Sequence, residues 1–193
     1  MAAETPAYEL LRKDGAFELR RYSGYITASV RVNESSYARA TSAGFNPLAD
    51  YIFGNNHASD RISMTAPVSA GRVCCQKIAM TAPVTATESE EDYVVSFTMP
   101  SEFSMEDLPR PNNAAVTLEA VDPHVAAAVR FSGFLGDENA TRAESELMAW
   151  IDAQGLKPAG EPLAAQYDAP WKPGFARHNE ILVPVEDIDA DSR

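Results

Sequence analysis

Alternating apolar and polar positions in the first thirty residues of the chain predict β-strands. Residues 8–12 and 17–32 are rich in aromatic and β-branched side chains, and the Lys13-Asp14-Gly15 segment between them is typical of a turn. We expect a bend at Ser23-Gly24, within the second run. Further strands are predicted over residues 62–84, as a pair of short strands around a loop, and over residues 93–99 and 180–185.

Apolar residues recur at helical spacing over residues 35–53. Asn33 or Ser35 can cap the start of this helix, and Gly54 suits the left-handed residue that often follows a last turn. Pro47 lies inside the helical pattern and has no backbone N–H to donate. We therefore expect a kink or a break in the helix just before this proline.

The second half of the chain repeats features of the first half. The segment Arg21-Tyr22-Ser23-Gly24-Tyr25-Ile26 matches Arg130-Phe131-Ser132-Gly133-Phe134-Leu135 in its aromatic, Ser-Gly and aliphatic positions. A second helix is predicted after the second copy, over residues 139–153. The strand over residues 180–185 then corresponds to the strand over residues 93–99.

These elements predict one α+β domain over residues 1–193. The expected fold is a distorted antiparallel β-barrel with two flanking helices, built from two pseudo-symmetric βαββ halves. The halves cover roughly residues 8–100 and 114–185, and residues 186–193 form an acidic tail. A groove where the halves meet is the natural ligand site, because such junctions are concave and apolar.

Composition and charge exclude several classes of function. Sixteen basic and twenty-eight acidic residues give a net charge of −12, which disfavours nucleic acid and anionic membrane surfaces as partners. No apolar run approaches the ~20 residues needed to cross a bilayer, and no signal peptide is readable, so we expect no membrane insertion and a cytoplasmic location. Cys74 and Cys75 are neighbours, which predicts free thiols, with a redox switch or a soft-metal site as the alternatives.

A duplicated Met-Thr-Ala-Pro-Val segment is the most unusual local feature. It contains Met64 in the first copy and Met80 in the second. Methionine side chains can fill a core, or they can line a pocket for a flat apolar ligand. The sequence does not decide between these two interpretations, and metal ligation by a methionine sulfur is a third.

The segment from Tyr167 to Glu180 is a second candidate for chemistry. Its prolines stiffen a loop that carries aromatic residues, which often make binding contacts. Lys172 and Arg177 could meet carboxylates at the mouth of a groove. Glu180 can accept hydrogen bonds from the backbone or from arginine, or it can serve as a pocket acid. The sequence shows no catalytic or metal-binding motif, which favours a binding function.

Together these residues resemble the SOUL heme-binding protein family over nearly the whole chain. The resemblance implies a distorted antiparallel barrel of two halves, similar to bacterial effector-binding domains, with heme or another tetrapyrrole in a shallow hydrophobic groove. The segments that carry it are Phe17-Glu18-Leu19-Arg20-Arg21-Tyr22, Tyr51-Ile52-Phe53-Gly54-Asn55-Asn56, the Met-Thr-Ala-Pro-Val repeat, and Tyr167-Asp168-Ala169-Pro170 with Arg177-His178-Asn179-Glu180-Ile181.

The resemblance also implies candidate heme contacts. A histidine proposed as an iron ligand in one branch of the family is replaced by Arg21 here, so we expect no strong axial histidine. In the other branch, heme lies between the first helix and the Tyr-Pro-rich loop. With the two methionines, the candidate cofactor-binding residues are Arg21, Phe45, Ala49, Met64, Met80, Trp171, Lys172 and Phe175.

The leading hypothesis is therefore a heme-binding protein that buffers or carries heme without transforming it. A binding module for another amphipathic small molecule is the second hypothesis, in which a buried Glu180 would favour cations. An enzyme that uses Glu180 as a general acid or base is the third. The sequence does not identify protein partners.

Overall fold

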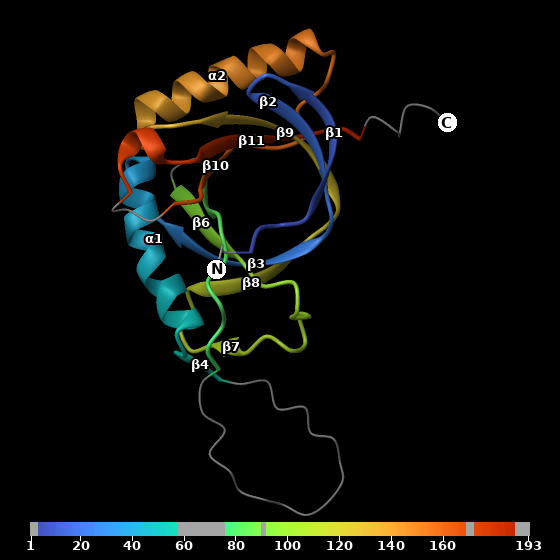
Figure 1. Cartoon of the computed structure of the whole chain (residues 1–193). Coiled ribbons are helices and arrows are strands. Elements are labelled where there is room, and N and C mark those ends of the chain that lie inside the picture. Colours follow the sequence, from blue (N-terminus) through green and yellow to red (C-terminus); the bar gives the residue numbers. More distant parts are fainter. Residues whose placement is uncertain (1–3, 58–75, 90–91, 169–171, 188–193) are drawn as a thin grey trace, which may run out of the picture.

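Figure 1 shows the computed structural model of the chain, which describes residues 4–57, 76–89, 92–168 and 172–187. Two long helices, one short helix and eleven strands are found in these residues. The helices are α1 (Tyr37–Ile52), α2 (Asp137–Ala153) and the 3-10 helix η1 (Gly174–Ala176). The strands are β1 (Tyr8–Asp14), β2 (Phe17–Tyr22), β3 (Tyr25–Val32), β4 (Asn56–His57), β5 (Val84–Ser89), β6 (Asp92–Thr98), β7 (Arg110–Pro111), β8 (Val116–Val121), β9 (His124–Phe131), β10 (Leu163–Gln166) and β11 (Asn179–Val185).

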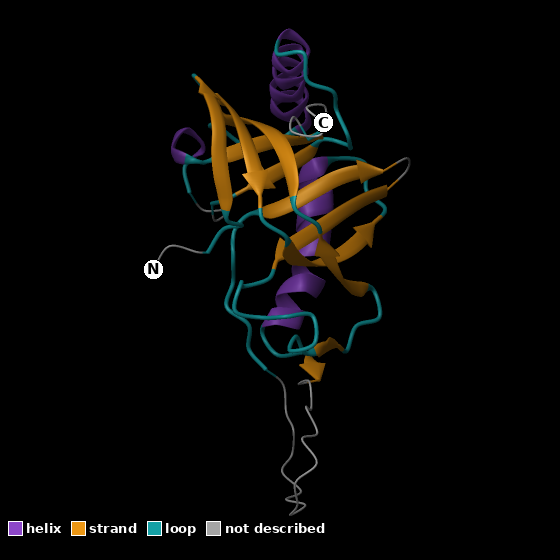
Figure 2. Ribbon diagram, turned by 90° about the vertical axis from the view of Figure 1, so that its right-hand side faces the viewer, coloured by secondary structure: helices purple, strands orange, loops and turns teal. Residues whose placement is uncertain are grey.

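Nine strands form one antiparallel sheet that curls strongly (Figures 1 and 2). Their order is β1-β2-β9-β11-β10-β5-β6-β3-β8, and β4 and β7 pair separately. The expected closed barrel is wrong, because the end strands β1 and β8 do not pair with each other. β1 pairs only with β2, through a hairpin at Gly15, where φ is +59°, and six of its seven residues are exposed. The molecule is an α+β fold with an open sheet.

Apart from β1, equivalent strands follow one another in the same order from both ends of the sheet. One half of the sheet runs β2-β9-β11-β10, and the other runs β8-β3-β6-β5. In the first of these, β2 comes from the first half of the chain, whereas β9, β11 and β10 come from the second half. In the other, β8 comes from the second half of the chain, and β3, β6 and β5 come from the first. The expected match between residues 93–99 and 180–185 agrees with this order, since β6 and β11 occupy equivalent places. The six-residue match is wrong: its first copy joins β2 to β3, whereas its second joins β9 to α2.

Both helices cover the same outer face of the curled sheet, as Figure 1 shows. α1 contacts β3, β5, β6 and β8, whereas α2 contacts β9 and β11. Gly44 allows the close approach of α1, because a Cβ at this position would lie 2.5 Å from the Cβ of Val95 on β6. Leu48 and Leu147 are fully buried in the main core beneath the two helices. Among the described residues, no helix covers the inner, concave face of the sheet.

α1 follows its predicted range closely, with two corrections. Ser36, not Asn33 or Ser35, caps the helix by accepting a hydrogen bond from the Arg39 backbone N–H. The helix also continues through Pro47, so of the expected kink or break, the break is wrong. Its buried residues on either side of the proline pack on the sheet, and this packing outweighs the missing hydrogen bond.

The least predictable strands lie in the middle of the sheet. The sequence suggested no separate strand for β5 or β10, which are neighbours there. The strand pair expected over residues 62–84 falls mainly outside the described residues, and its described part, residues 76–83, forms no strand. Both cysteines also lie outside the described residues. No helix in the described part of the chain is both long enough and apolar enough to cross a membrane.

Candidate functional site

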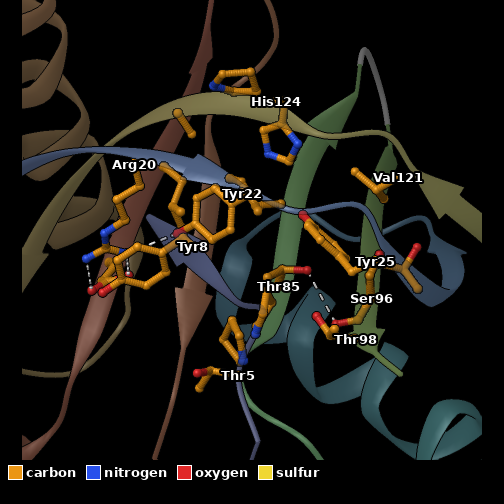
Figure 3. Close-up of a pocket in the computed structure, with 18 of the residues that line it drawn as sticks. Thr5, Tyr8, Arg20, Tyr22, Tyr25, Thr85, Ser96, Thr98, Val121 and His124 are labelled. Carbon is orange, nitrogen blue, oxygen red and sulfur yellow. Dashed lines mark hydrogen bonds and ion pairs between the residues drawn. The ribbon is translucent and has the colours of Figure 1, made fainter. Parts of the chain in front are cut away.

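A cavity of about 620 Å³ lies on the concave face of the sheet, in the volume range typical of small-molecule sites. Side chains from β1 to β3, β5, β6 and β8 to β11 line it, together with Thr5 and Pro6, which precede β1 (Figure 3). It lies where the two halves of the sheet meet, as the sequence led us to expect of a ligand site. Most of its lining surface is apolar, and charged and hydroxyl-bearing side chains lie among the apolar ones.

A buried ion pair crosses one wall of the cavity. Arg20 on β2 donates two hydrogen bonds to the Glu180 carboxylate on β11, at 2.7 and 2.8 Å. β9 lies between these two strands, and its concave side presents Ala126 and Ala128. Because these side chains are small, Arg20 can reach across β9 to its partner. The local sequence of β9 therefore permits the pair.

The pair is the centre of a larger hydrogen-bond network. The Tyr167 hydroxyl donates to Glu180 at 2.7 Å, and His178 Nε2 contacts the other carboxylate oxygen at 2.8 Å. Arg20 also contacts Glu18 and the Tyr22 hydroxyl. Burial by itself raises the pKa of Glu180, but the hydrogen bonds from Arg20, His178 and Tyr167 outweigh it and lower the pKa to about 2.

This network argues against two of the sequence hypotheses. A carboxylate with a pKa of about 2 holds too few protons near neutral pH to serve as a general acid, and it is too weak a base to remove one efficiently. A cationic ligand would also have to displace Arg20 to pair with Glu180. The Glu180 side chain thus stabilises the fold of this wall.

Aromatic rings form the upper part of the same wall. Tyr22 lies at their centre, with ring centroids 5.3 Å from Tyr8, 6.4 Å from Tyr25 and 5.4 Å from His124 (Figure 3). Cross-strand register explains the stack, since Tyr22 lies directly opposite His124. Burial raises the pKa of Tyr22 to about 12, so its hydroxyl stays protonated.

Hydroxyl groups line the cavity on β3, β5 and β6. Along β6, Val95 and Phe97 point into the main core, so the alternating Ser96 and Thr98 face the cavity. The hydroxyl-bearing side chains that line the cavity on these strands are Thr27, Thr85, Thr87, Ser96 and Thr98.

None of the candidate heme contacts that the structure describes lines this cavity. On α1, Phe45 packs against Phe97 with ring centroids 5.4 Å apart, and Ala49 is buried. Arg21 lies on the opposite face of β2 from Arg20, within 4 Å of acidic side chains. Met80 is exposed, which argues against core filling. Met64 and Trp171 lie outside the described residues.

The two other candidates, Lys172 and Phe175, lie away from the cavity, on the segment between β10 and β11. Phe175 is 85% exposed, and Phe134, on the β9–α2 connection, is 62% exposed. Gly174, which precedes Phe175, packs directly against the Phe134 ring, since an added Cβ at Gly174 would lie 2.8 Å from that ring. The Arg177 guanidinium lies 4.4 Å from the same ring. We call Phe134, Lys172, Phe175 and Arg177 the outer aromatic surface.

Hydrogen bonds fix the loop that carries this surface. The Gly133 N–H donates to the Gly174 carbonyl at 2.9 Å, and Asn179 Nδ2 donates to the Gly133 carbonyl at 3.0 Å. Lys172 Nζ donates to Asp168 at 2.7 Å. The exposed rings are thus held on a fixed backbone.

Sequence reasoning singled out Glu180 and its segment but missed the rest of the concave wall. Arg20, Tyr22 and His124 were not candidates, although Arg20 and Tyr22 are two residues apart in a predicted strand and therefore share a face. That alternation was the available signal. It could not show which face was concave.

Comparison with known proteins places the fold. "Heme-binding protein 2" from Homo sapiens is 29% identical over 137 residues, which is 69% of this chain and 62% of that protein, so the chain spans about three fifths of its relative's length. The EcmrR C-terminal domain superposes with a TM-score of 0.63 at 16% identity, covering 94% of this chain and 99% of that one. A hydrolase from Listeria innocua gives 0.60 at 10% identity, covering 91% and 94%. These two structures share the fold.

A family model described as SOUL heme-binding protein matches residues 3–184. The match starts before β1 and stops one residue short of the end of β11, so it includes the concave cavity and the outer aromatic surface. It confirms the resemblance drawn from the sequence. The chain belongs to the SOUL heme-binding protein family.

Proposed function

We propose that this protein binds heme without a covalent bond, on the outer aromatic surface, and buffers or carries it as cargo. The observation that carries the proposal is the exposure of Phe175 and Phe134 on a backbone fixed by hydrogen bonds. Large exposed aromatic residues are costly to leave in water and commonly mark a binding surface. Two flat rings at one place suit a flat macrocycle.

Charge favours the outer surface over the concave cavity for heme. Heme carries two propionate groups, which are anionic at neutral pH. Among the described residues that line the cavity, Arg20 is the single arginine or lysine, and it already contacts Glu180 and Glu18. The cavity also has carboxylates at Glu119, Asp122, Glu161 and Glu180. Propionates would meet net negative charge there.

The outer surface offers cations instead. Lys172 has three N–H donors and uses one on Asp168, so the others can reach a propionate. Arg177 is buried beneath Phe134, where its Nε donates to the Lys172 carbonyl, and it adds positive charge below the ring. Lys172 and the two exposed rings thus supply both kinds of contact that heme needs.

Binding of this kind does not depend on a strong iron–histidine bond. The histidine nearest in sequence to the surface, His178, turns its Nε2 toward Glu180 and the cavity. Burying about 400 Å² of apolar area at ~25 cal/mol per Å² gives roughly 10 kcal/mol. Subtracting an association cost of at least ~4 kcal/mol leaves an affinity of tens of micromolar, which suits a buffer or carrier.

The test is a titration of hemin into the purified protein, followed by the Soret band. We expect saturable binding that Phe175→Ala weakens by about tenfold or more, since a ring contact is lost. Phe53→Ala is the matched control, because Phe53 is also an exposed phenylalanine but lies at the far end of α1. Equal binding by Phe175→Ala and the wild type would refute the proposed surface.

A binding role is also favoured over catalysis. The strongest candidate for a catalytic acid or base, Glu180, is held ionised by Arg20 and has a lowered pKa. The Glu180→Gln variant is therefore expected to keep hemin binding while losing stability. Measured turnover of any tested ester or glycoside that disappears in Glu180→Gln would contradict this view.

A further inference from the structure

The concave cavity has properties that heme binding on the outer surface leaves unused. It has a wall of aromatic rings around Tyr22 and a wall of hydroxyl groups on β5 and β6 (Figure 3). The tyrosine and histidine rings offer faces on which a flat ring can stack. The cavity is also adequate in size for a small organic molecule.

The hydroxyl wall supplies hydrogen-bonding groups without charge. Thr98 lines the cavity, and among the described residues its hydroxyl makes no hydrogen bond, whereas its backbone carbonyl accepts one from Thr81. The same holds for the hydroxyls of Ser96 and Thr87 within that part of the chain. Groups of this kind can donate to or accept from polar atoms at the edge of a ligand.

The charges inside the cavity are already paired. Glu180 is contacted by Arg20, Tyr167 and His178, so no unpaired carboxylate remains deep in the described lining to hold a desolvated cation. Glu119, Asp122 and Glu161 are exposed at the edge and make no ion pair within the described residues. They disfavour anions, whereas their attraction for cations is weakened by solvent.

We propose that the concave cavity is a second ligand site, for an uncharged planar aromatic molecule with hydrogen-bonding groups at its edge. The ring stacks on the aromatic wall around Tyr22, and its polar edge meets the hydroxyls of Ser96 and Thr98. The site is separate from the outer aromatic surface, because the two share no residue.

Three dyes of related shape and different charge test this site. Nile red is uncharged, Nile blue carries a similar ring system as a cation, and resorufin is an anionic phenoxazinone. Fluorescence titrations of the full chain should show Nile red binding at least about tenfold more tightly than either charged dye, since burying an unpaired charge is costly. Tighter or equal binding of Nile blue or resorufin would overturn the proposal, as would no saturable binding of Nile red.

Variants locate the bound dye. Thr98→Val keeps the shape of the side chain and removes one hydroxyl, so Nile red should bind about fivefold more weakly. Thr141→Val is the matched control, because Thr141 lies on an exposed face of α2 and should leave binding unchanged. Ser96→Phe should fill the cavity and abolish dye binding. Unchanged binding in Thr98→Val would overturn the proposed contact, even if Ser96→Phe does not fold.

The two proposals fail separately. Phe175→Ala should lose hemin and keep Nile red, whereas Ser96→Phe should lose Nile red and keep hemin. If Ser96→Phe folds and loses hemin instead, heme occupies the cavity and the second-site proposal is wrong. If Phe175→Ala loses the dye, Nile red binds the outer surface and the second site is again refuted.

Discussion

The Arg20–Glu180 pair gives the sharpest prediction about stability. Glu180 is 2% exposed, and Glu180→Gln removes its charge while keeping its size. The variant removes one of the two carboxylates that contact the buried Arg20 guanidinium, and Glu18 remains as the other. The Tyr22 hydroxyl and the Tyr8 ring also stay in contact with it. Breaking a buried ion pair by removing one partner is strongly destabilising, whereas replacing both partners by apolar residues is often nearly neutral.

The pKa of Glu180 sets the magnitude of the effect. It falls from an ordinary value of 4.5 to about 2. At 1.36 kcal/mol per pKa unit, ionised Glu180 contributes about 3 kcal/mol to the free energy of unfolding. Because the folded-state pKa is the lower one, this contribution is present above pH 4.5 and is lost as the pH falls toward 2.

Urea denaturation at several pH values measures both consequences. At pH 7 we expect Glu180→Gln to lose about 3 kcal/mol of unfolding free energy. The wild type should lose its advantage over the variant between pH 4.5 and 2. A double variant, Arg20→Met with Glu180→Leu, should be more stable than Glu180→Gln. A loss at pH 7 below about 0.5 kcal/mol, the range of neutral surface substitutions, would refute the reasoning.

Two further substitutions test how packing positions the cavity. Ala128→Leu should fill the space that Arg20 crosses and lower the free energy of unfolding by about 3 kcal/mol. Ala120→Leu, at an exposed position on β8, is a near-neutral control. Equal urea midpoints for the two variants would contradict this. Gly44→Ala should destabilise the protein by about 1–3 kcal/mol, although alanine has the better helix propensity, because the added Cβ would clash with Val95. Val95→Ala in the same chain should relieve the clash. A raised Tm for Gly44→Ala would contradict this.

Strands with strong local patterns were predictable from the sequence. β2 and β3 alternate aromatic and β-branched residues with polar ones, and both were expected together with the bend at Ser23-Gly24. β10 was not, because Leu163-Ala164-Ala165-Gln166 is short and rich in alanine. It is a strand because β5 and β11 pair with it from both sides. This is a long-range effect that no local pattern carries.

The candidate site shows the same division between local and long-range information. The loop that carries Lys172 and Phe175 was recognisable from its prolines and aromatic residues. Phe45 and Ala49 were chosen with it, yet α1 turns both toward the sheet. Arg20 and Glu180 are 160 residues apart, and only the strand order brings them together across β9. The concave cavity could not be assembled from sequence spacing.

The most direct test of the proposed heme surface is two-dimensional amide NMR of the protein titrated with hemin. Paramagnetic ferric iron broadens the signals of amides that lie near it. The account predicts that Gly133 and Gly174, beside the exposed phenylalanines, broaden first, while Thr27 and Ser96 in the cavity keep sharp signals. Early broadening of Thr27 and Ser96, with Gly133 and Gly174 unaffected, would contradict it.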